Sequence, residues 1–222
     1  MKPGKDVVAA VKRSLSHARL STYERAAAPA HSSGSTALSL YAWNAEVSGA
    51  LLSDLHVCEV VIRNAISEIL EILYGEAWPW SQTFEFSLPD YPNSYSPRKD
   101  LLAARRYART PGKVIPELKM VFWQRLLTRR YDDRLWNMHL VQAFPHMDSS
   151  STVAVHRAAL HGDIDSLREL RNRIAHHEPI FTRNLVRDQA TIHKLIGYRC
   201  LLTVQWLLTY ERSSQIIAER PV

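Results

Sequence analysis

The sequence predicts an all-α protein, and three observations lead to that prediction. Apolar residues recur at helical spacing along most of the 222 residues, and residues 38–74 keep that spacing without a proline. The chain holds only 7 glycines, too few for the many tight turns of a β-sandwich. A hydrophobic content of 46% is enough to close a core. We therefore expect a helical bundle built on one long central helix.

The N-terminal segment is expected to contain one helix followed by a flexible connection. Apolar residues at helical spacing over 6–28 predict the helix, which should stop before Pro29. Residues 30–36 are small and polar, and they predict a connection that supplies Ser35 or Thr36 as the N-cap of the next helix.

The central helix is expected over residues 38–74, with Gly75 as its C-cap and with a possible break near Gly49. At 100° per residue one face of this helix gathers apolar side chains, so it should pack in the middle of the domain. That face consists of Leu55, Cys58, Ile62, Ile66, Ile69 and Leu73.

The second half of the chain is expected to begin with an irregular insertion. Residues 78–97 hold four prolines and several aromatics, which predicts an irregular segment pinned to the surface by Trp78, Trp80, Phe84 and Phe86. A turn is expected at 110–112. Helices are expected over residues 99–108, 118–131, 135–144, 152–177 and 191–212, the last one apolar and buried. This divides the chain into an N-terminal helix and connection (1–34), a helical domain (35–212) and a C-terminal tail (213–222).

Charge and cysteine usage predict a cytoplasmic protein with an anionic partner. The formal net charge of +6 and the pI near 9.4 favour a phosphate-bearing partner only weakly. Cys58 and Cys200 lie in apolar patterns and are expected to be free thiols in a reducing compartment. No apolar run of signal-peptide length follows the N-terminus, and residues 195–210 are too short and too polar to span a membrane.

The most informative segment runs from Leu170 to Pro179. On a helical wheel Arg171 falls inside the apolar arc of the predicted 152–177 helix. An unpaired buried charge costs several kcal/mol, so Arg171 needs either a carboxylate partner or a polar cleft that opens onto it.

Arg171 and His176 are five residues apart, which places them about 140° apart on an ideal helix. Pro179 should end the helix near His177. The last turn can then loosen and bring the imidazole back toward Arg171, or a second copy of the chain can complete the set.

An arginine beside a histidine suits metal-independent RNA cleavage. His176 is the candidate general acid or base, and Arg171 is the candidate ligand of the scissile phosphate. Asn172 is a candidate to orient the imidazole or to bind a phosphate oxygen. Attack by the ribose 2′-hydroxyl would make DNA refractory. No cofactor or metal is expected.

The sequence resembles a known family at this segment. Arg171-Asn172-x-x-x-His176, followed by His177-Glu178-Pro179, is similar to the signature of Abi-like (abortive infection) proteins of the HEPN superfamily. Glu59 and Arg63 resemble the family's Glu-x-x-x-Arg helix, and residues 120–127 resemble its tryptophan-containing middle helix. The resemblance covers most of residues 38–210.

The resemblance implies a HEPN-like all-α bundle, a homodimer, and a metal-independent endoribonuclease with its site in the cleft between subunits. It assigns the catalytic roles to Arg171 and His176, with Asn172 between them and with His177 as a supporting residue. The function implied is phage defence or toxin-like growth arrest. One branch, controlled by nucleotidylation, has tyrosine where this chain has Glu178, so that control is not expected, and no antitoxin can be inferred.

Several alternatives remain open from the residues alone. Glu59 lies in an apolar arc and pairs either with Arg171 or with Arg63, four residues on. His176 and His177 would otherwise serve as C-terminal residues of the helix. The spacing of the four histidines of this region argues against zinc, and they are His156, His161, His176 and His177. A non-catalytic module that binds RNA or protein is the alternative function.

The densest basic cluster is the candidate track for an RNA backbone, although such runs are usually solvated faces. Tyr107 or Trp123 would be available there for base stacking. The candidate RNA-binding residues are Arg105, Arg106, Arg109, Arg125, Arg129 and Arg130.

Overall fold

The protein is described by a computed structural model over residues 4–28 and 34–221. Every regular element in these ranges is helical, which confirms the all-α prediction. The first elements are α1 (Lys5–Leu15), α2 (His17–Ala27), α3 (Gly34–Tyr74), η2 (Trp78–Trp80), α4 (Gln82–Ser87), α5 (Pro97–Arg105), α6 (Pro111–Val114) and η3 (Ile115–Glu117). The remaining ones are α7 (Met120–Leu126), η4 (Arg129–Tyr131), η5 (Asp132–Trp136), α8 (Asn137–Ala143), α9 (Val153–Ala175), α10 (Leu185–Arg199), α11 (Leu201–Leu208) and α12 (Ser213–Ala218).

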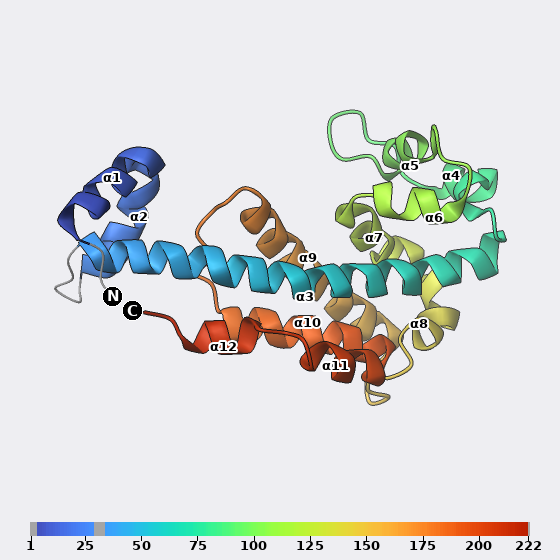
Figure 1. Cartoon of the computed structure of the whole chain (residues 1–222). Helices are drawn as coiled ribbons and strands as arrows, with labels where there is room; N and C mark the ends of the chain where they lie inside the picture. The colour runs from blue at the N-terminus through green and yellow to red at the C-terminus, as the bar shows by residue number, and fades with distance from the viewer. Residues whose placement is uncertain (1–3, 29–33, 222) are drawn as a thin grey trace.

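The long helix α3 is the axis of the molecule (Figure 1). Its 41 residues run without a break at Gly49 and extend for about 60 Å. Gly75 has φ 85° and its N–H donates to the carbonyl of Glu71, so it ends the helix as expected. The predicted apolar face is buried except at Leu73, which is 37% exposed.

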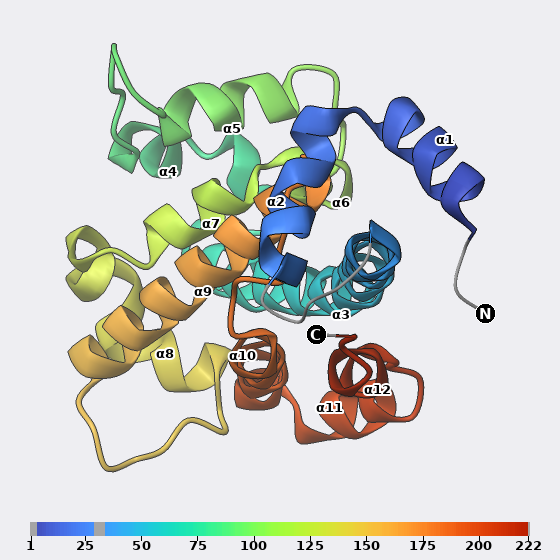
Figure 2. The ribbon, with the colours of Figure 1, turned by 90° about the vertical axis from the view of Figure 1, so that its left-hand side faces the viewer.

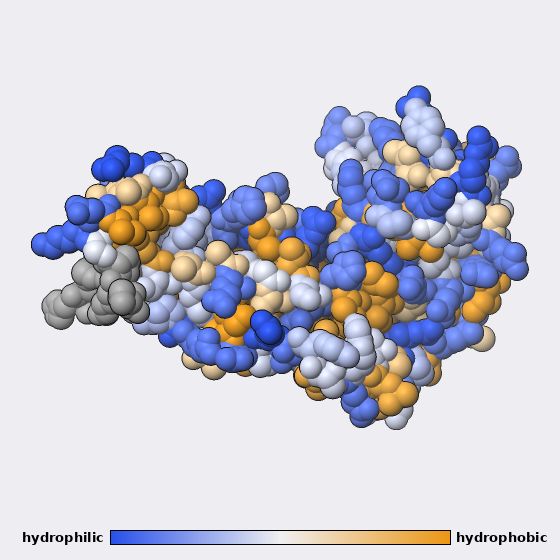
Figure 3. Space-filling view, viewed as in Figure 1, coloured by the Kyte–Doolittle hydropathy of each residue, from blue (hydrophilic) through white to orange (hydrophobic). Residues whose placement is uncertain are grey.

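Other helices pack around α3 on several sides. α10 and α12 run along one side, and α9 crosses another (Figures 1 and 2). α2 packs near the N-terminal end of α3, while α4 to α7 form a lobe at its C-terminal end. The space-filling surface is hollowed between these two ends, over the middle of α3 (Figure 3).

The N-terminal helix prediction was wrong in one respect. Ser16 takes φ 71° and breaks it into α1 and α2, with its hydroxyl accepting from the N–H of Arg19. α3 starts at Gly34, earlier than the expected N-cap at Ser35 or Thr36. Pro29 and most of the expected connection lie outside the described residues.

The insertion at 78–97 is more regular and more deeply packed than predicted. It contains η2 and α4, because Ser81 caps α4 by accepting from the N–H of Phe84. Trp78 and Phe84 are fully buried and join the core through edge-to-face ring contacts, so they do more than pin a surface segment. Phe86 is exposed and lies under the guanidinium of Arg98.

The predicted middle helices are present with shifted ends. The 99–108 helix is α5, the expected turn at 110–112 opens α6, and the 118–131 helix shortens to α7 followed by η4. The 135–144 helix is α8, preceded by the π-helical turn η5. The 152–177 helix is α9, with Thr152 as N-cap.

The C-terminal prediction needs two corrections. The single buried helix expected over 191–212 is two helices, because the extended backbone of Cys200 separates α10 from α11, and much of α11 is exposed. Residues assigned to the tail form α12, whose Ser213 donates to Asp54 of α3 at 2.5 Å. Cys58 and Cys200 are both free thiols. None of the described helices combines the length and the apolar character that crossing a membrane requires.

Candidate functional site

A cavity of about 430 Å³ lies where α3, α9 and the segment from η3 to α7 meet. It brings together four residues that the sequence analysis singled out, two from α3 and two from α9. Four basic and two acidic side chains line it, so it can hold an anion. The lining residues are Glu59, Arg63, Pro116, Glu117, Leu118, Lys119, Met120, Val121, Arg168, Arg171 and Asn172.

Arg171 is exposed to this cavity and is not held by a carboxylate. Among the described residues its guanidinium makes no hydrogen bond and no ion pair. The neighbouring positions Leu170 and Ile174 are buried, so the apolar arc is real, but at Arg171 it faces an open space. The sequence analysis expected either a carboxylate partner or a polar cleft for Arg171, and the structure has the polar cleft.

Glu59 pairs with Arg63, and the proposed contact with Arg171 is absent. Their side chains are 18% and 13% exposed, and Arg63 Nη1 also donates to the carbonyl of Pro116 at 3.1 Å. The pair therefore ties α3 to the segment that forms the opposite wall of the cavity. It shapes the site and leaves the Arg171 charge uncompensated.

Two basic residues of the cavity were missed by the sequence analysis. Arg168 Nη2 lies 2.7 Å from the carboxyl of Asp165. Burial raises the pKa of Asp165, but the hydrogen bonds that it accepts from Arg168 and Gln124 outweigh burial, so its pKa is lowered. Lys119 lies 3.6 Å from Asp100. The spacing of Arg168, three residues before Arg171 on one helix face, would have revealed it. Lys119 comes from a distant loop and carried no such signal.

The C-terminal end of α9 is a tight left-handed turn. His176 caps the helix, and His177 takes φ 56° where glycine is usual. The N–H of Glu178 donates to the carbonyl of Arg173 at 2.8 Å, and that of His177 to the carbonyl of Ile174 at 3.0 Å. These are the two bonds of a Schellman motif. His176 is exposed and does not line the cavity, so one chain brings together Arg171 and Asn172 but not His176.

Asn44 of α3 holds the chain that follows this turn, and the sequence analysis missed it. Its Oδ1 accepts from the N–H groups of Ile180 at 2.8 Å and Phe181 at 3.2 Å, and the residue is 5% exposed. From α2, Arg19 donates to the carbonyl of His177 at 2.5 Å. No sequence pattern links these residues, because they lie more than a hundred positions apart.

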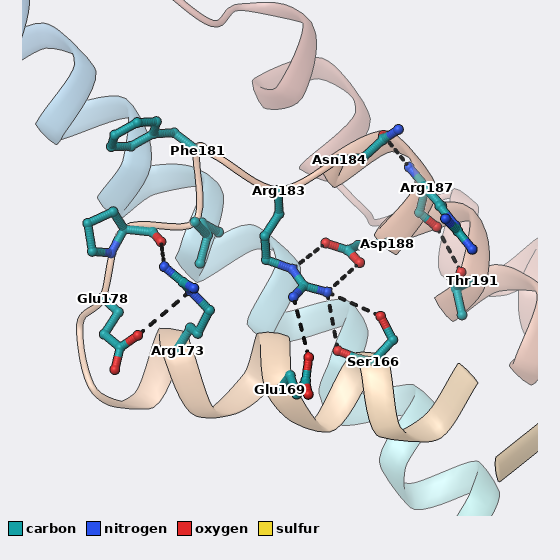
Figure 4. A network of polar contacts seen from close by, with 12 residues as sticks. Ser166, Glu169, Arg173, Glu178, Phe181, Arg183, Asn184, Arg187, Asp188 and Thr191 are labelled. Atoms are coloured by element: carbon teal, nitrogen blue, oxygen red, sulfur yellow. Dashed lines mark hydrogen bonds and ion pairs between the residues drawn. The ribbon is translucent and has the colours of Figure 1, made fainter. Parts of the chain in front are cut away.

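A charged network fixes the following segment against α9. Figure 4 shows the guanidinium of Arg183 between Asp188, Ser166 and Glu169, while Phe181 points away from it. Arg183 Nε lies 2.8 Å from Asp188, which is 6% exposed. The hydrogen bonds that Asp188 accepts from Arg183 raise the pKa of the guanidinium, so Arg183 stays charged. Its role is to position the turn after α9.

The predicted basic track does not meet the cavity, since none of its six arginines lines it. Arg105 is occupied, because it pairs with Glu85 at 2.5 Å and donates to the carbonyl of Pro79. The other five are exposed, and they are Arg106, Arg109, Arg125, Arg129 and Arg130. Tyr107 is 82% exposed and can stack on a base, whereas Trp123 is fully buried and cannot.

Within the part of the chain that the structure describes, no three His, Cys, Asp or Glu side chains gather as possible metal ligands. This includes the four histidines considered for zinc. No family model, no curated protein and no solved structure matches this chain.

Proposed function

We propose that this chain is an endoribonuclease of the HEPN type that cuts RNA without a metal ion, in phage defence or toxin-like growth arrest. The observation that carries the proposal is Arg171, an unpaired guanidinium beside Asn172 in a cavity large enough for a phosphate and its sugar. The resemblance of this segment to Abi-like proteins supports the same conclusion.

In this proposal the two ends of the motif have separate tasks. Arg171 binds the scissile phosphate and offsets the charge that develops on it in the transition state. Asn172 donates to a phosphate oxygen. His176 takes the proton from the ribose 2′-hydroxyl or returns one to the leaving oxygen, which leaves a 2′,3′-cyclic phosphate end.

His176 lies outside the cavity of its own chain, so we propose that a homodimer completes the site. Arg171 of one copy and His176 of the other would then act on one phosphate. The same observation favours the alternative function, a basic helical module that binds RNA without cutting it. The two differ in whether a covalent bond is broken.

Cleavage in the presence of EDTA separates these functions. Labelled single-stranded RNA should be cut to products with cyclic phosphate ends, and His176→Ala should lower the rate by about a hundredfold or more while RNA binding stays. His146→Ala is the matched control, because His146 is exposed and does not line the cavity. Binding without cleavage would support the alternative, and strict dependence on added Mg²⁺ or Zn²⁺ would exclude the proposed chemistry.

Mixing two inactive variants tests the shared site. Arg171→Ala and His176→Ala chains, refolded together, form mixed dimers in which one of the two sites keeps both residues. Random pairing then restores about a quarter of the wild-type activity. No recovery in a mixture shown to contain mixed dimers would mean that both residues act from the same chain.

A further inference from the structure

A second cavity, of about 330 Å³, lies beside the turn after α9, between α2 and α3. It shares no residue with the cavity that holds Arg171. Aromatic, small and polar side chains line it, which is the composition of a small-ligand pocket. The lining residues are Tyr23, Tyr41, Asn44, Ala45, Ser48, Gly49, Leu52, Ile174, Ala175, His177 and Glu178.

The amide of Asn44 provides this cavity with a free donor. Two backbone N–H groups, of Ile180 and Phe181, point at the same side-chain atom, which must therefore be the oxygen. The amide nitrogen is then oriented away from that turn. It makes no hydrogen bond with any described residue, although Asn44 is 5% exposed and lines the cavity. This nitrogen still reaches solvent, so it can donate to a ligand acceptor in the cavity.

The walls of the cavity fit a flat ring. Tyr41 is half-buried and meets Tyr23 edge-to-face, with ring centroids 5.0 Å apart. The wall that α3 forms carries small side chains at this place, because Ala45, Ser48 and Gly49 lie on one face of the helix. A Cβ added at Gly49 would meet nothing within 4 Å, so the space at this position is open.

The second cavity lies next to the first along the same pair of helices. Arg171 lines the first and Ile174, three residues on and on the same helix face, lines the second, about 4.5 Å further along the axis of α9. His176 lies at the exposed C-terminal end of α9, between Asn172 and His177 in the sequence.

We propose that the second cavity is a nucleobase subsite, which holds one unstacked base of a single-stranded RNA whose phosphate lies at Arg171. The base stacks on Tyr41, and Asn44 Nδ2 donates to a ring nitrogen or carbonyl oxygen on its edge. His177, which is exposed, lines the same cavity. This inference rests on the proposed function, since it takes RNA as the ligand.

Filling the cavity at Gly49 tests the proposal with little risk to the fold. Gly49→Leu places a good helix former inside α3 and its side chain in the open space. Gly162→Leu is the matched control: Gly162 is an exposed glycine inside α9 with nothing within 4 Å of an added Cβ, and it lies outside both cavities. Circular dichroism and thermal melts verify that both variants fold.

The probes are fluorescein-labelled eight-residue oligoadenylate RNA and an abasic ribose-phosphate oligomer of the same length, whose binding is followed by anisotropy. Wild type should bind the RNA roughly fivefold or more tightly than the abasic oligomer, because one stacked base contributes at least about that factor. Gly49→Leu should bring this ratio of affinities to about one, and Gly162→Leu should leave it at the wild-type value. Asn44→Asp keeps the acceptor for the turn but removes the donor, and it should reduce the ratio.

The outcomes for the subsite and for the proposed function are distinct. A ratio near one in wild type, or a ratio that Gly49→Leu leaves unchanged, would overturn the subsite even if RNA is cut. If neither oligomer binds, the proposed function fails, and ligand-observed NMR with adenosine alone decides the subsite. Saturation transfer from the wild-type protein to adenosine that is lost in Gly49→Leu supports the subsite. Absence of transfer from the wild-type protein overturns it.

Discussion

The pairing of Glu59 predicts how two arginines of the site differ in their effect on stability. Arg63 is mostly buried, bonded to Glu59 and to the carbonyl of Pro116, whereas Arg171 is exposed and unpaired. Glu59→Gln removes the charge that neutralises Arg63. A hydrogen bond to a charged partner contributes about 1.5–3 kcal/mol, and both side chains keep some solvent contact, so we expect a loss of about 2 kcal/mol.

Arg171→Met should change stability by no more than about 0.5 kcal/mol, as for surface positions in general. For a chain of this size a loss of about 2 kcal/mol lowers Tm by roughly 4–8 °C. Urea unfolding of Glu59→Gln, Arg63→Met, Arg171→Met and the two double variants provides both cycles. We expect coupling of about 1 kcal/mol or more between Glu59 and Arg63 and additivity between Glu59 and Arg171. Coupling of the second pair as strong as that of the first would refute this account of the cavity.

Three further predictions concern the elements around the site. Asp188→Asn removes the buried carboxylate that neutralises Arg183, leaves only the exposed Glu169 at 4.0 Å, and should cost about 3 kcal/mol in urea unfolding, whereas an unchanged midpoint would make the network of Figure 4 incidental. Burial lowers the pKa of His161 below its usual 6.5, so the unfolded chain binds the proton more readily than the folded chain. The free energy of unfolding should therefore fall as pH drops below about 6.5. His161→Gln should flatten that dependence between about pH 7 and 5. His177→Gly should raise stability by about 1 kcal/mol by relieving the left-handed backbone, and a loss would show that the imidazole makes a needed contact.

The fold could be predicted where local periodicity decided the structure. The spacing of apolar residues identified α3 and α9, and Gly75 marked the end of α3. Prediction from periodicity failed where a single residue that is neither proline nor glycine breaks a helix, as Ser16 and Cys200 do. It also failed for α11, whose apolar composition predicts burial, although Leu201, Leu202, Trp206 and Leu208 are exposed and only its other face packs on the core.

The site could be predicted in part for the same reason. Arg171 and Asn172 share one helix, and Glu59 and Arg63 share another, so their relative placement follows from helical geometry. That the two pairs face one cavity depends on how α3 and α9 pack. Asn44 and Lys119 reach the two cavities through contacts between segments far apart in the chain, which no local pattern encodes.

The turn after α9 bears on how Arg171 and His176 could act together. Bringing the imidazole toward Arg171 within one chain would require the last turn of α9 to rewind. That turn and the segment after it are held by two Schellman bonds, by the two bonds that Asn44 accepts and by the bond from Arg19. At about 1 kcal/mol each, their loss would cost roughly 5 kcal/mol, a large share of the stability of a typical domain. Pairing Arg171 with the exposed His176 of a second copy breaks none of these bonds, which is why we propose a shared site and not a loosened turn.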